Sequence, residues 1–125
     1  MERKMERADI AIIGTGPGGV SAALTAKVRN KNILLIGKKQ MSDKVSKAHQ
    51  IMNYPGLPAV TGADMAKAFE KQLAMMEIDI TDSRIGTVYA MGDYFAIQAG
   101  EEVLEAKSVI LACGVVSGKT LPGEE

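Results

Sequence analysis

A glycine-rich turn between two apolar segments constrains this chain more than any other feature. The turn is Gly14-Thr-Gly-Pro-Gly-Gly19, and it follows residues 8–13, a short apolar run rich in β-branched side chains. Such a run is typical of a strand buried on both faces in a parallel sheet. After the turn, apolar and small residues recur at helical spacing and predict a helix to about Arg29. Residues 33–36 repeat the buried-strand pattern, so the segment is predicted to be a right-handed βαβ unit.

The glycine spacing matches the fingerprint of dinucleotide-binding turns, and the turn lies where that fingerprint must lie, between a buried strand and a helix. Gly14 permits the tight turn, Gly16 lets a pyrophosphate approach the backbone, and Gly19 lets the helix pack close to the strand. Pro17 suits the first helical position because it has no amide hydrogen to leave unsatisfied, and Gly18 lies in the same turn. Backbone amides and the positive end of the helix would then contact phosphates. The sequence therefore predicts a dinucleotide site on this turn.

The end of the second predicted strand leaves the identity of the dinucleotide open. About 20 residues beyond the turn, an Asp or Glu commonly holds a ribose hydroxyl, but Leu35-Ile-Gly-Lys-Lys39 contains no acid. Lys38 and Lys39 are compatible with the 2′-phosphate of NADP or with a solvated pair of lysines at a strand end. The solvated pair is the preferred interpretation.

The middle of the chain is predicted to contain a long ligand-contacting loop and a second helix. Residues 37–63 carry several Pro and Gly residues and no clear period, which indicates a loop with a helical turn. Thr61-Gly-Ala-Asp64 fits a capping pattern before a helix. The apolar face of that helix is interpreted as core rather than a cofactor pocket, and it comprises Met65, Ala68, Phe69, Leu73 and Met76.

Strand signals dominate the second half of the chain. Short alternating segments separated by turns predict an antiparallel meander over residues 78–80, 85–91, 94–98 and 103–106. Residues 108–112 return to the composition of a buried strand before Gly114. Together with the βαβ unit, these segments predict an α/β fold with a parallel sheet and an antiparallel meander.

Composition excludes several classes of function. The 15 basic and 15 acidic side chains cancel, so no net field recruits nucleic acid or an anionic membrane. Residues 1–7 are charged rather than followed by an apolar signal core, and no apolar run approaches the ~18 residues that span a bilayer. Cys113 is the only cysteine, which excludes an internal disulfide, a thiolate zinc site and a dithiol redox pair. A cytoplasmic protein that binds neither nucleic acid nor membrane is therefore expected.

Three motifs together resemble the FAD domain of thioredoxin reductases. The first is the turn at Gly14–Gly19, and the second is Asn53-Tyr-Pro-Gly-Leu-Pro58 followed by Thr61-Gly62. The third is Val109-Ile-Leu-Ala-Cys-Gly114 with Pro122-Gly-Glu124 after it. The resemblance covers almost the whole chain and implies a Rossmann-like FAD/NAD(P)-binding domain in which meander, parallel sheet and helices form three ββα layers.

The resemblance also implies which residues hold the cofactor. Asn53 would lie beside the isoalloxazine, and the backbone of Arg84 and Ile85 would contact adenine. Ala112 and Gly114 would close over the cofactor at the end of a strand. The pyrophosphate would be held by the glycine turn, that is, by Gly14, Gly16, Pro17, Gly18 and Gly19. No catalytic residue and no metal ligand is expected in this chain.

Two departures from the family pattern concern the surroundings of the flavin. Cys113 stands where the family usually has Thr, a mild change because a buried thiol behaves as a small apolar group. Ser42-Asp-Lys-Val45 replaces the Gly-Gly-Gln segment that normally wraps the flavin. The altered segment is compatible with a branch of the family that reduces something other than thioredoxin.

Residues 1–125 are predicted to be the amino-terminal part of a FAD-binding domain, cut at a hinge near Leu121–Glu125 before the NAD(P)H domain. The full-length parent would pass hydride from NAD(P)H to FAD and then to a disulfide or a small redox protein, and a homodimer is a possible assembly. The chain alone, with one glycine fingerprint and one cysteine, is expected to be inactive. Two alternatives are a non-catalytic flavin or nucleotide module that works with a partner chain, and a plain NADP-binding domain.

Three side chains have both a functional and a structural interpretation. His49 is interpreted as an exposed loop residue rather than an acid or base near the flavin. Cys113 is interpreted as a buried structural thiol rather than a nucleophile. Tyr54 either stacks on the flavin or packs beneath its loop, and the sequence favours neither.

Overall fold

Strands and helices alternate in the first part of the chain, and strands alone follow. The computed structural model describes residues 7–40 and 43–114. The predictions made for the charged amino terminus, for Ser42 and for the tail at Leu121–Glu125 concern residues outside this described part. The helices are α1 (Pro17–Val28), α2 (Asp43–Ser46) and α3 (Gly62–Met75). The strands are β1 (Ala8–Ile13), β2 (Ile33–Gly37), β3 (Ile80–Asp82), β4 (Ile85–Ala90), β5 (Phe95–Ala99) and β6 (Glu102–Leu111).

All of these strands belong to one mixed sheet in the order β3-β2-β1-β6-β5-β4. β3, β2, β1 and β6 run parallel, whereas β4, β5 and β6 form an antiparallel meander. β6 belongs to both halves, because its first residues pair with β5 (Glu102 with Ala99) and its last residues pair with β1 (Leu111 with Ile13). A single strand of 10 residues thus joins the parallel sheet to the meander.

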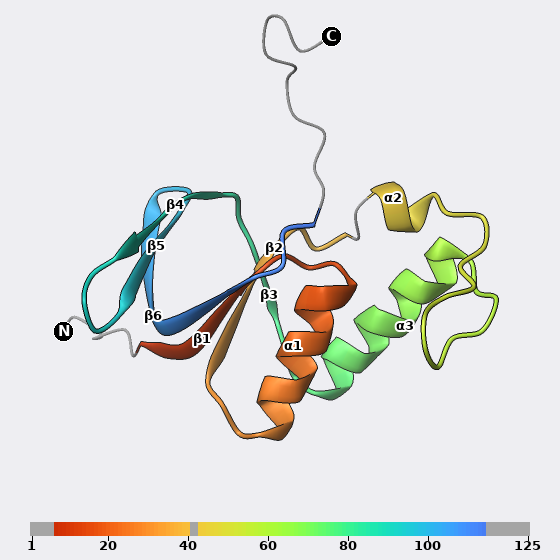
Figure 1. Cartoon of the computed structure of the whole chain (residues 1–125), viewed down its shortest axis with the longest axis horizontal. Coiled ribbons are helices and arrows are strands. Elements are labelled where there is room, and N and C mark those ends of the chain that lie inside the picture. The colour runs from red at the N-terminus through yellow and green to blue at the C-terminus, as the bar shows by residue number, and fades with distance from the viewer. Residues whose placement is uncertain (1–6, 41–42, 115–125) are drawn as a thin grey trace, which may run out of the picture.

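The parallel strands are covered on both faces, which gives the molecule three layers. On one face, Ala11 and Ile13 share a core with Ile97 of the meander. On the other face, Ile12 and Leu35 share a core with α1 and α3, which lie side by side away from β4 and β5 (Figure 1). Alternating residues of β1 therefore face two different cores, as expected for a strand buried on both sides. The predicted α/β, Rossmann-like fold with three ββα layers is confirmed.

The second predicted helix is confirmed as α3, and local chemistry explains where it begins. Thr61 is the N-cap, and its Oγ1 accepts a hydrogen bond from the Asp64 amide at 3.1 Å. Met65, Phe69 and Leu73 recur at helical spacing and are buried. This stripe is core, in agreement with the interpretation of its spacing.

The prediction for residues 78–80 is wrong in the type of pairing. They are expected to open the antiparallel meander, but β3 pairs in parallel with β2, with Ile80 beside Leu35. The reason is the connection: α3 carries the chain back across one face of the sheet, so the next strand runs in the same direction as β2. β3 is consequently an edge strand whose carboxyl end lies beside that of β2.

Residues 103–106 and 108–112, predicted as separate strands, fall in the single strand β6 and the residue after it. The polar pair of Lys107 and Ser108 interrupts the apolar pattern and so favours a break. Both side chains instead bind Asp9 of the neighbouring strand. Lys107 Nζ lies 3.3 Å from Asp9 Oδ1, and Ser108 Oγ donates to the Asp9 carbonyl at 2.7 Å. The strand continues through polar residues because their partner lies on β1.

Asp9 also binds the backbone of the loop between α1 and β2. Its Oδ2 accepts a hydrogen bond from the Asn32 amide at 2.9 Å. This bond first, and then the ion pair to β6, lower the pKa of the Asp9 carboxyl. Nearby, Arg7 binds Glu105 at 2.7 Å and lies 3.7 Å from the centre of the Tyr94 ring. These contacts attach the amino end of β1 to its neighbours.

We expect Asp9→Asn to lower the stability of the chain at neutral pH and to matter little in strong acid. Because folding lowers the pKa of Asp9 from its ordinary value of 3.8, the ionised carboxylate favours the folded state above that value. This contribution is lost as the pH falls through the lower pKa of the folded state. Urea unfolding of both forms, from neutral pH to strong acid, measures the effect. A stability difference that stays constant over that range would contradict it.

Candidate functional site

Two glycines of the turn are required by close approach between backbone segments. Gly14 follows β1 with a φ of 122°, and a Cβ built there would lie 2.0 Å from the carbonyl oxygen of Ala112. A Cβ on Gly19 would lie 1.7 Å from the Gly14 oxygen. No side chain fits at such distances from backbone atoms. The start of α1, the end of β1 and the residue after β6 therefore meet at Gly14.

Gly16 is not required by packing. It is the N-cap of α1 without a side-chain cap, and a Cβ built there would meet no atom within 4 Å. The Val20 amide donates to the Gly16 carbonyl at 3.0 Å, so the amides of Gly18 and Gly19 have no acceptor within the helix. Pro17 has no amide hydrogen, and the first turn carries no acid. Open space at Gly16, together with these amides at the positive end of a helix of 12 residues, fits an anion such as a phosphate.

The residues predicted to close over the cofactor lie beside this turn. Ala112 follows β6, and its amide donates to the Ile13 carbonyl at 2.8 Å. A Cβ on Gly18 would lie 3.8 Å from the Ala112 side chain, an ordinary contact. Gly114 has a φ of 65°, in the region that favours glycine. The structure thus brings the end of β6 to the glycine turn.

Sequence reasoning missed Thr15, which links the turn to the end of β2. Its Oγ1 donates a hydrogen bond to the carbonyl of Lys38 at 2.6 Å. A Cβ on Gly37 would lie 2.7 Å from the Thr15 Cγ2. The contact explains why position 37 is a glycine, because a side chain there would displace Thr15. Lys38 and Lys39 are exposed, as a solvated pair would be.

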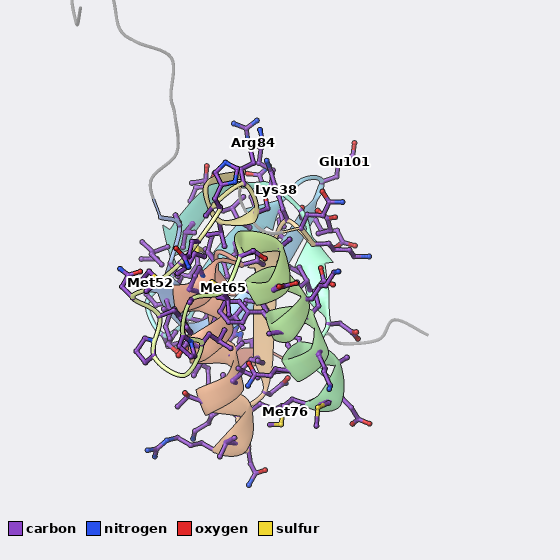
Figure 2. The ribbon with its side chains drawn as sticks, turned by 90° about the vertical axis from the view of Figure 1, so that its right-hand side faces the viewer. Lys38, Met52, Met65, Met76, Arg84 and Glu101 are labelled. Atoms are coloured by element: carbon purple, nitrogen blue, oxygen red, sulfur yellow. The ribbon has the colours of Figure 1, made fainter. Side chains whose placement is uncertain are left out.

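Arg84 and Ile85 follow β3, at the edge of the sheet where the parallel strands end. The Arg84 carbonyl accepts a hydrogen bond from the Gly100 amide at 3.2 Å, and the residue is exposed. Ile85 packs against the meander core and is half-buried. Figure 2 shows Lys38 and Arg84 at one end of the molecule, with Met76, just after α3, at the other. The adenine contact remains a prediction. Arg84 and Ile85 lie at the carboxyl end of the parallel strands, as the glycine turn does.

The loop that contains Asn53 packs on α3. The rings of Tyr54 and Phe69 lie 5.5 Å apart at 59°, so the structure favours packing beneath the loop, one of the two alternatives for Tyr54. Ile51 and Val60 form an antiparallel bridge that closes the loop. Asn53 is exposed, and no hydrogen bond between described residues joins it to the glycine turn. Its position beside an isoalloxazine remains a prediction.

A groove of about 540 Å³ lies between α1, α3 and this loop. Its walls are largely apolar and include Leu24, Tyr54, Phe69 and Met75. It begins at Val20, directly after the glycine turn, and follows the side of α1 rather than its amino end. The groove is adjacent to the candidate phosphate site and is not part of it.

Two side chains with competing interpretations lie on the surface. His49 is exposed, in agreement with its interpretation as a loop residue. Cys113 is exposed as well, so the expectation of a buried thiol is wrong. The strand end before it is open to solvent, since Leu111 is 70% exposed. Within the described part of the chain, the Cys113 thiol has a long contact of 3.8 Å with the Ile13 carbonyl.

The described residues contain neither a metal-binding cluster nor a membrane-crossing helix. Over residues 7–40 and 43–114, no group of three or more His, Cys, Asp or Glu side chains is placed to hold a metal ion. In that same part of the chain, no helix has both the length and the apolar character to cross a bilayer.

Similarity to known proteins extends over nearly the whole chain. The model of one family, described as pyridine nucleotide-disulphide oxidoreductase, matches residues 8–125. The thioredoxin reductase of Peptoclostridium acidaminophilum is 33% identical over 120 residues, which are 94% of this chain and 38% of that relative.

Solved structures resemble the chain in the same region. A ferredoxin-flavin thioredoxin reductase from Clostridium acetobutylicum matches with a TM-score of 0.89 and 44% identity, over 94% of this chain and 41% of that chain. The thioredoxin reductase of Streptococcus pyogenes matches with a TM-score of 0.81 and 27% identity, over 91% of this chain and 37% of that chain. The chain therefore spans between 37% and 41% of the length of these relatives.

We expect alanine to be tolerated at Gly16 and not at Gly19. Gly19→Ala drives a Cβ into the Gly14 carbonyl and should lower the free energy of unfolding by about 2 kcal/mol or more. Gly16→Ala places its Cβ in open space and should cost no more than about 1 kcal/mol. Urea unfolding of the two variants measures the difference. Equal losses would show that packing, and not a ligand, requires Gly16.

Proposed function

The chain belongs to the pyridine nucleotide-disulphide oxidoreductase family, and we propose that it binds FAD as the amino-terminal part of the FAD-binding domain of a thioredoxin reductase-like oxidoreductase. A difference among the glycines of the turn carries the proposal. Gly14 and Gly19 are explained by backbone packing, whereas Gly16 borders open space. A pyrophosphate would use that space, because it approaches the backbone closely and requires amide donors there.

The roles proposed for individual residues follow from their places in the fold. The amides of Gly16, Gly18 and Gly19 would donate to the phosphates. The hydrogen bond between Thr15 and Lys38 would keep the turn fixed to the end of β2. Ala112 and Gly114 would bound the site from the end of β6. When bound, FAD would supply the redox chemistry by accepting reducing equivalents from one partner and passing them to another. The contribution of this chain would be to bind and orient the cofactor.

Contacts farther from the turn are proposed on the resemblance. Asn53 would lie near the isoalloxazine, and the backbone of Arg84 and Ile85 would lie near adenine. The position of Arg84 and Ile85 at the carboxyl edge of the parallel strands supports their part of the assignment. No hydrogen bond between described residues supports or opposes the part assigned to Asn53. The flavin absorbance spectrum of Asn53→Ala, compared with that of wild type, would test it.

The remaining activity would lie in other parts of the parent protein. Because the chain spans well under half of its relatives, we propose that the NAD(P)H site and the site for a disulfide or small redox protein lie elsewhere in that parent. A dithiol pair would lie elsewhere too, since Cys113 is the only cysteine of this chain. The cytoplasmic location and the homodimer remain predictions.

The electron donor of the parent has two candidates. Family membership favours NAD(P)H, whereas the relative with 44% identity is described as a ferredoxin-flavin thioredoxin reductase, which favours ferredoxin. Anaerobic titration of the full-length protein separates them. Loss of the oxidised flavin absorbance with NADPH or NADH supports the nicotinamide donor. Loss of that absorbance only with reduced ferredoxin supports the protein donor.

In the full-length parent, Gly16→Val should release FAD and keep the fold. A branched side chain would fill the open space that phosphate oxygens must enter, so we expect the FAD affinity to fall on the order of 100-fold. The flavin absorbance of the purified protein measures cofactor content, and urea unfolding verifies the fold.

Gly86→Val supplies the matched control for this experiment. Gly86 is exposed on β4, where a Cβ would make only an ordinary contact, 3.9 Å from the Gln98 carbonyl oxygen. The control should retain its FAD. Normal FAD content in a well-folded Gly16→Val protein would refute the assignment of the pyrophosphate to this turn.

A further inference from the structure

The end of β3 places a carboxylate beside the position that lacks one at the end of β2. In the parallel pairing of these strands, Gly37 lies opposite Asp82. Each is the last residue of its strand, and neighbouring strands lie about 4.8 Å apart. Asp82 therefore stands one strand spacing along the edge from the place where dinucleotide-binding folds commonly carry their ribose-binding acid.

Asp82 and Gly37 also share one face of the sheet. Side chains alternate along a strand, and the paired residues Leu35 and Ile80 both lie in the core that contains α1 and α3. Two residues farther along, Gly37 and Asp82 return to that face. A Cβ on Gly37 would indeed meet Thr15, in the turn before α1. The side chain of Asp82 consequently starts from the face that carries the glycine turn.

Thr15 occupies the space that a side chain at position 37 would need. A side chain on Gly37 would lie 2.7 Å from the Thr15 Cγ2, and the Thr15 Oγ1 donates to the Lys38 carbonyl at 2.6 Å. A carboxylate side chain at position 37 would therefore displace Thr15 and break its hydrogen bond to Lys38. The last position of β2 therefore has no room for an acid, and β3 is the strand paired with β2 on that side.

The carboxylate of Asp82 is available to a ligand. Asp82 is exposed, and over residues 7–40 and 43–114 no hydrogen bond or ion pair engages its side chain. Lys38 follows Gly37, the residue paired with Asp82, and Arg84 lies two residues beyond Asp82. Lys38 and Arg84 lie at the same end of the molecule (Figure 2). No described contact within the fold accounts for an acid at this position.

We propose that Asp82 is the ribose-binding acid of this chain, and that its carboxylate accepts hydrogen bonds from hydroxyls of the adenosine ribose of FAD. The inference rests on the proposed function, because it requires FAD to bind with its pyrophosphate at the glycine turn. The same carboxylate would repel a 2′-phosphate and so would disfavour the binding of NADP at this site.

Binding of FAD analogues to the full-length apoprotein tests the contact. Wild type and Asp82→Asn are titrated with FAD and with FAD whose adenosine ribose lacks the 2′- or the 3′-hydroxyl, and flavin fluorescence gives each Kd. We expect Asp82→Asn to weaken FAD binding by about 10-fold or more, because a hydrogen bond to a charged acceptor is lost. The analogue that lacks the contacted hydroxyl should be weakened by less than about 2-fold by the same substitution.

Asp79→Asn is the matched control, since Asp79 is an exposed acid just before β3, at the opposite end of that strand. It should leave the Kd of all three ligands unchanged. Unchanged FAD affinity in Asp82→Asn, or an equal loss for FAD and both analogues, would overturn the ribose contact while FAD binding by wild type still supports the proposed function. Absence of FAD binding by wild type would overturn both.

A comparison within the wild-type protein needs no variant. Removal of the contacted hydroxyl from FAD should by itself raise the Kd by about 10-fold. If both deoxy analogues bind wild type as tightly as FAD does, the Asp82 carboxylate does not accept a hydrogen bond from the ribose.

Discussion

The approach of the Gly14 carbonyl to the α-carbon of Gly19 is the contact on which the rest of the structure depends. A Cβ on Gly19 would lie 1.7 Å from that oxygen, so the first turn of α1 is pressed against the end of β1 with no side chain between them. The contact fixes the direction in which the helix leaves the sheet. Because it is steric and lies within the chain, the amino end of α1 is positioned before any ligand arrives.

β6 extends this local arrangement to the whole domain. Its final residues pair with β1 and place Ala112 at the carboxyl end of the parallel strands, while its first residues pair with β5. The side chains of Lys107 and Ser108 bind Asp9 where the strand passes from one partner to the other. A displacement of the meander would therefore move one wall of the candidate site, although no meander strand other than β6 reaches the glycine turn among the described residues.

The parts of the fold that could be predicted are those with local causes. Strand composition, glycine positions and helical spacing specify the βαβ unit, and a Thr–Asp cap specifies the start of α3. The pairing of β3 could not be derived in this way, because a strand of 3 residues does not reveal which neighbour it joins. The continuity of β6 depends on Asp9, 98 residues before Lys107. The exposure of Cys113 and the contact between Thr15 and Gly37 likewise depend on which distant segments meet.

The pairing of β1 with β6 has a consequence for the order in which the protein is built. Ser108 and the Asp9 carbonyl that it binds are separated by 99 positions, so residues 9–108 must all leave the ribosome before this contact can form. Closing so long a loop costs more chain entropy than forming the local contacts of the βαβ unit, so we expect it to come late in folding. A dinucleotide that requires both the glycine turn and the end of β6 would bind only after this closure, and by mass action would stabilise the closed form. Bound cofactor would then hold the two ends of this long loop together, in addition to serving the chemistry of the mature protein.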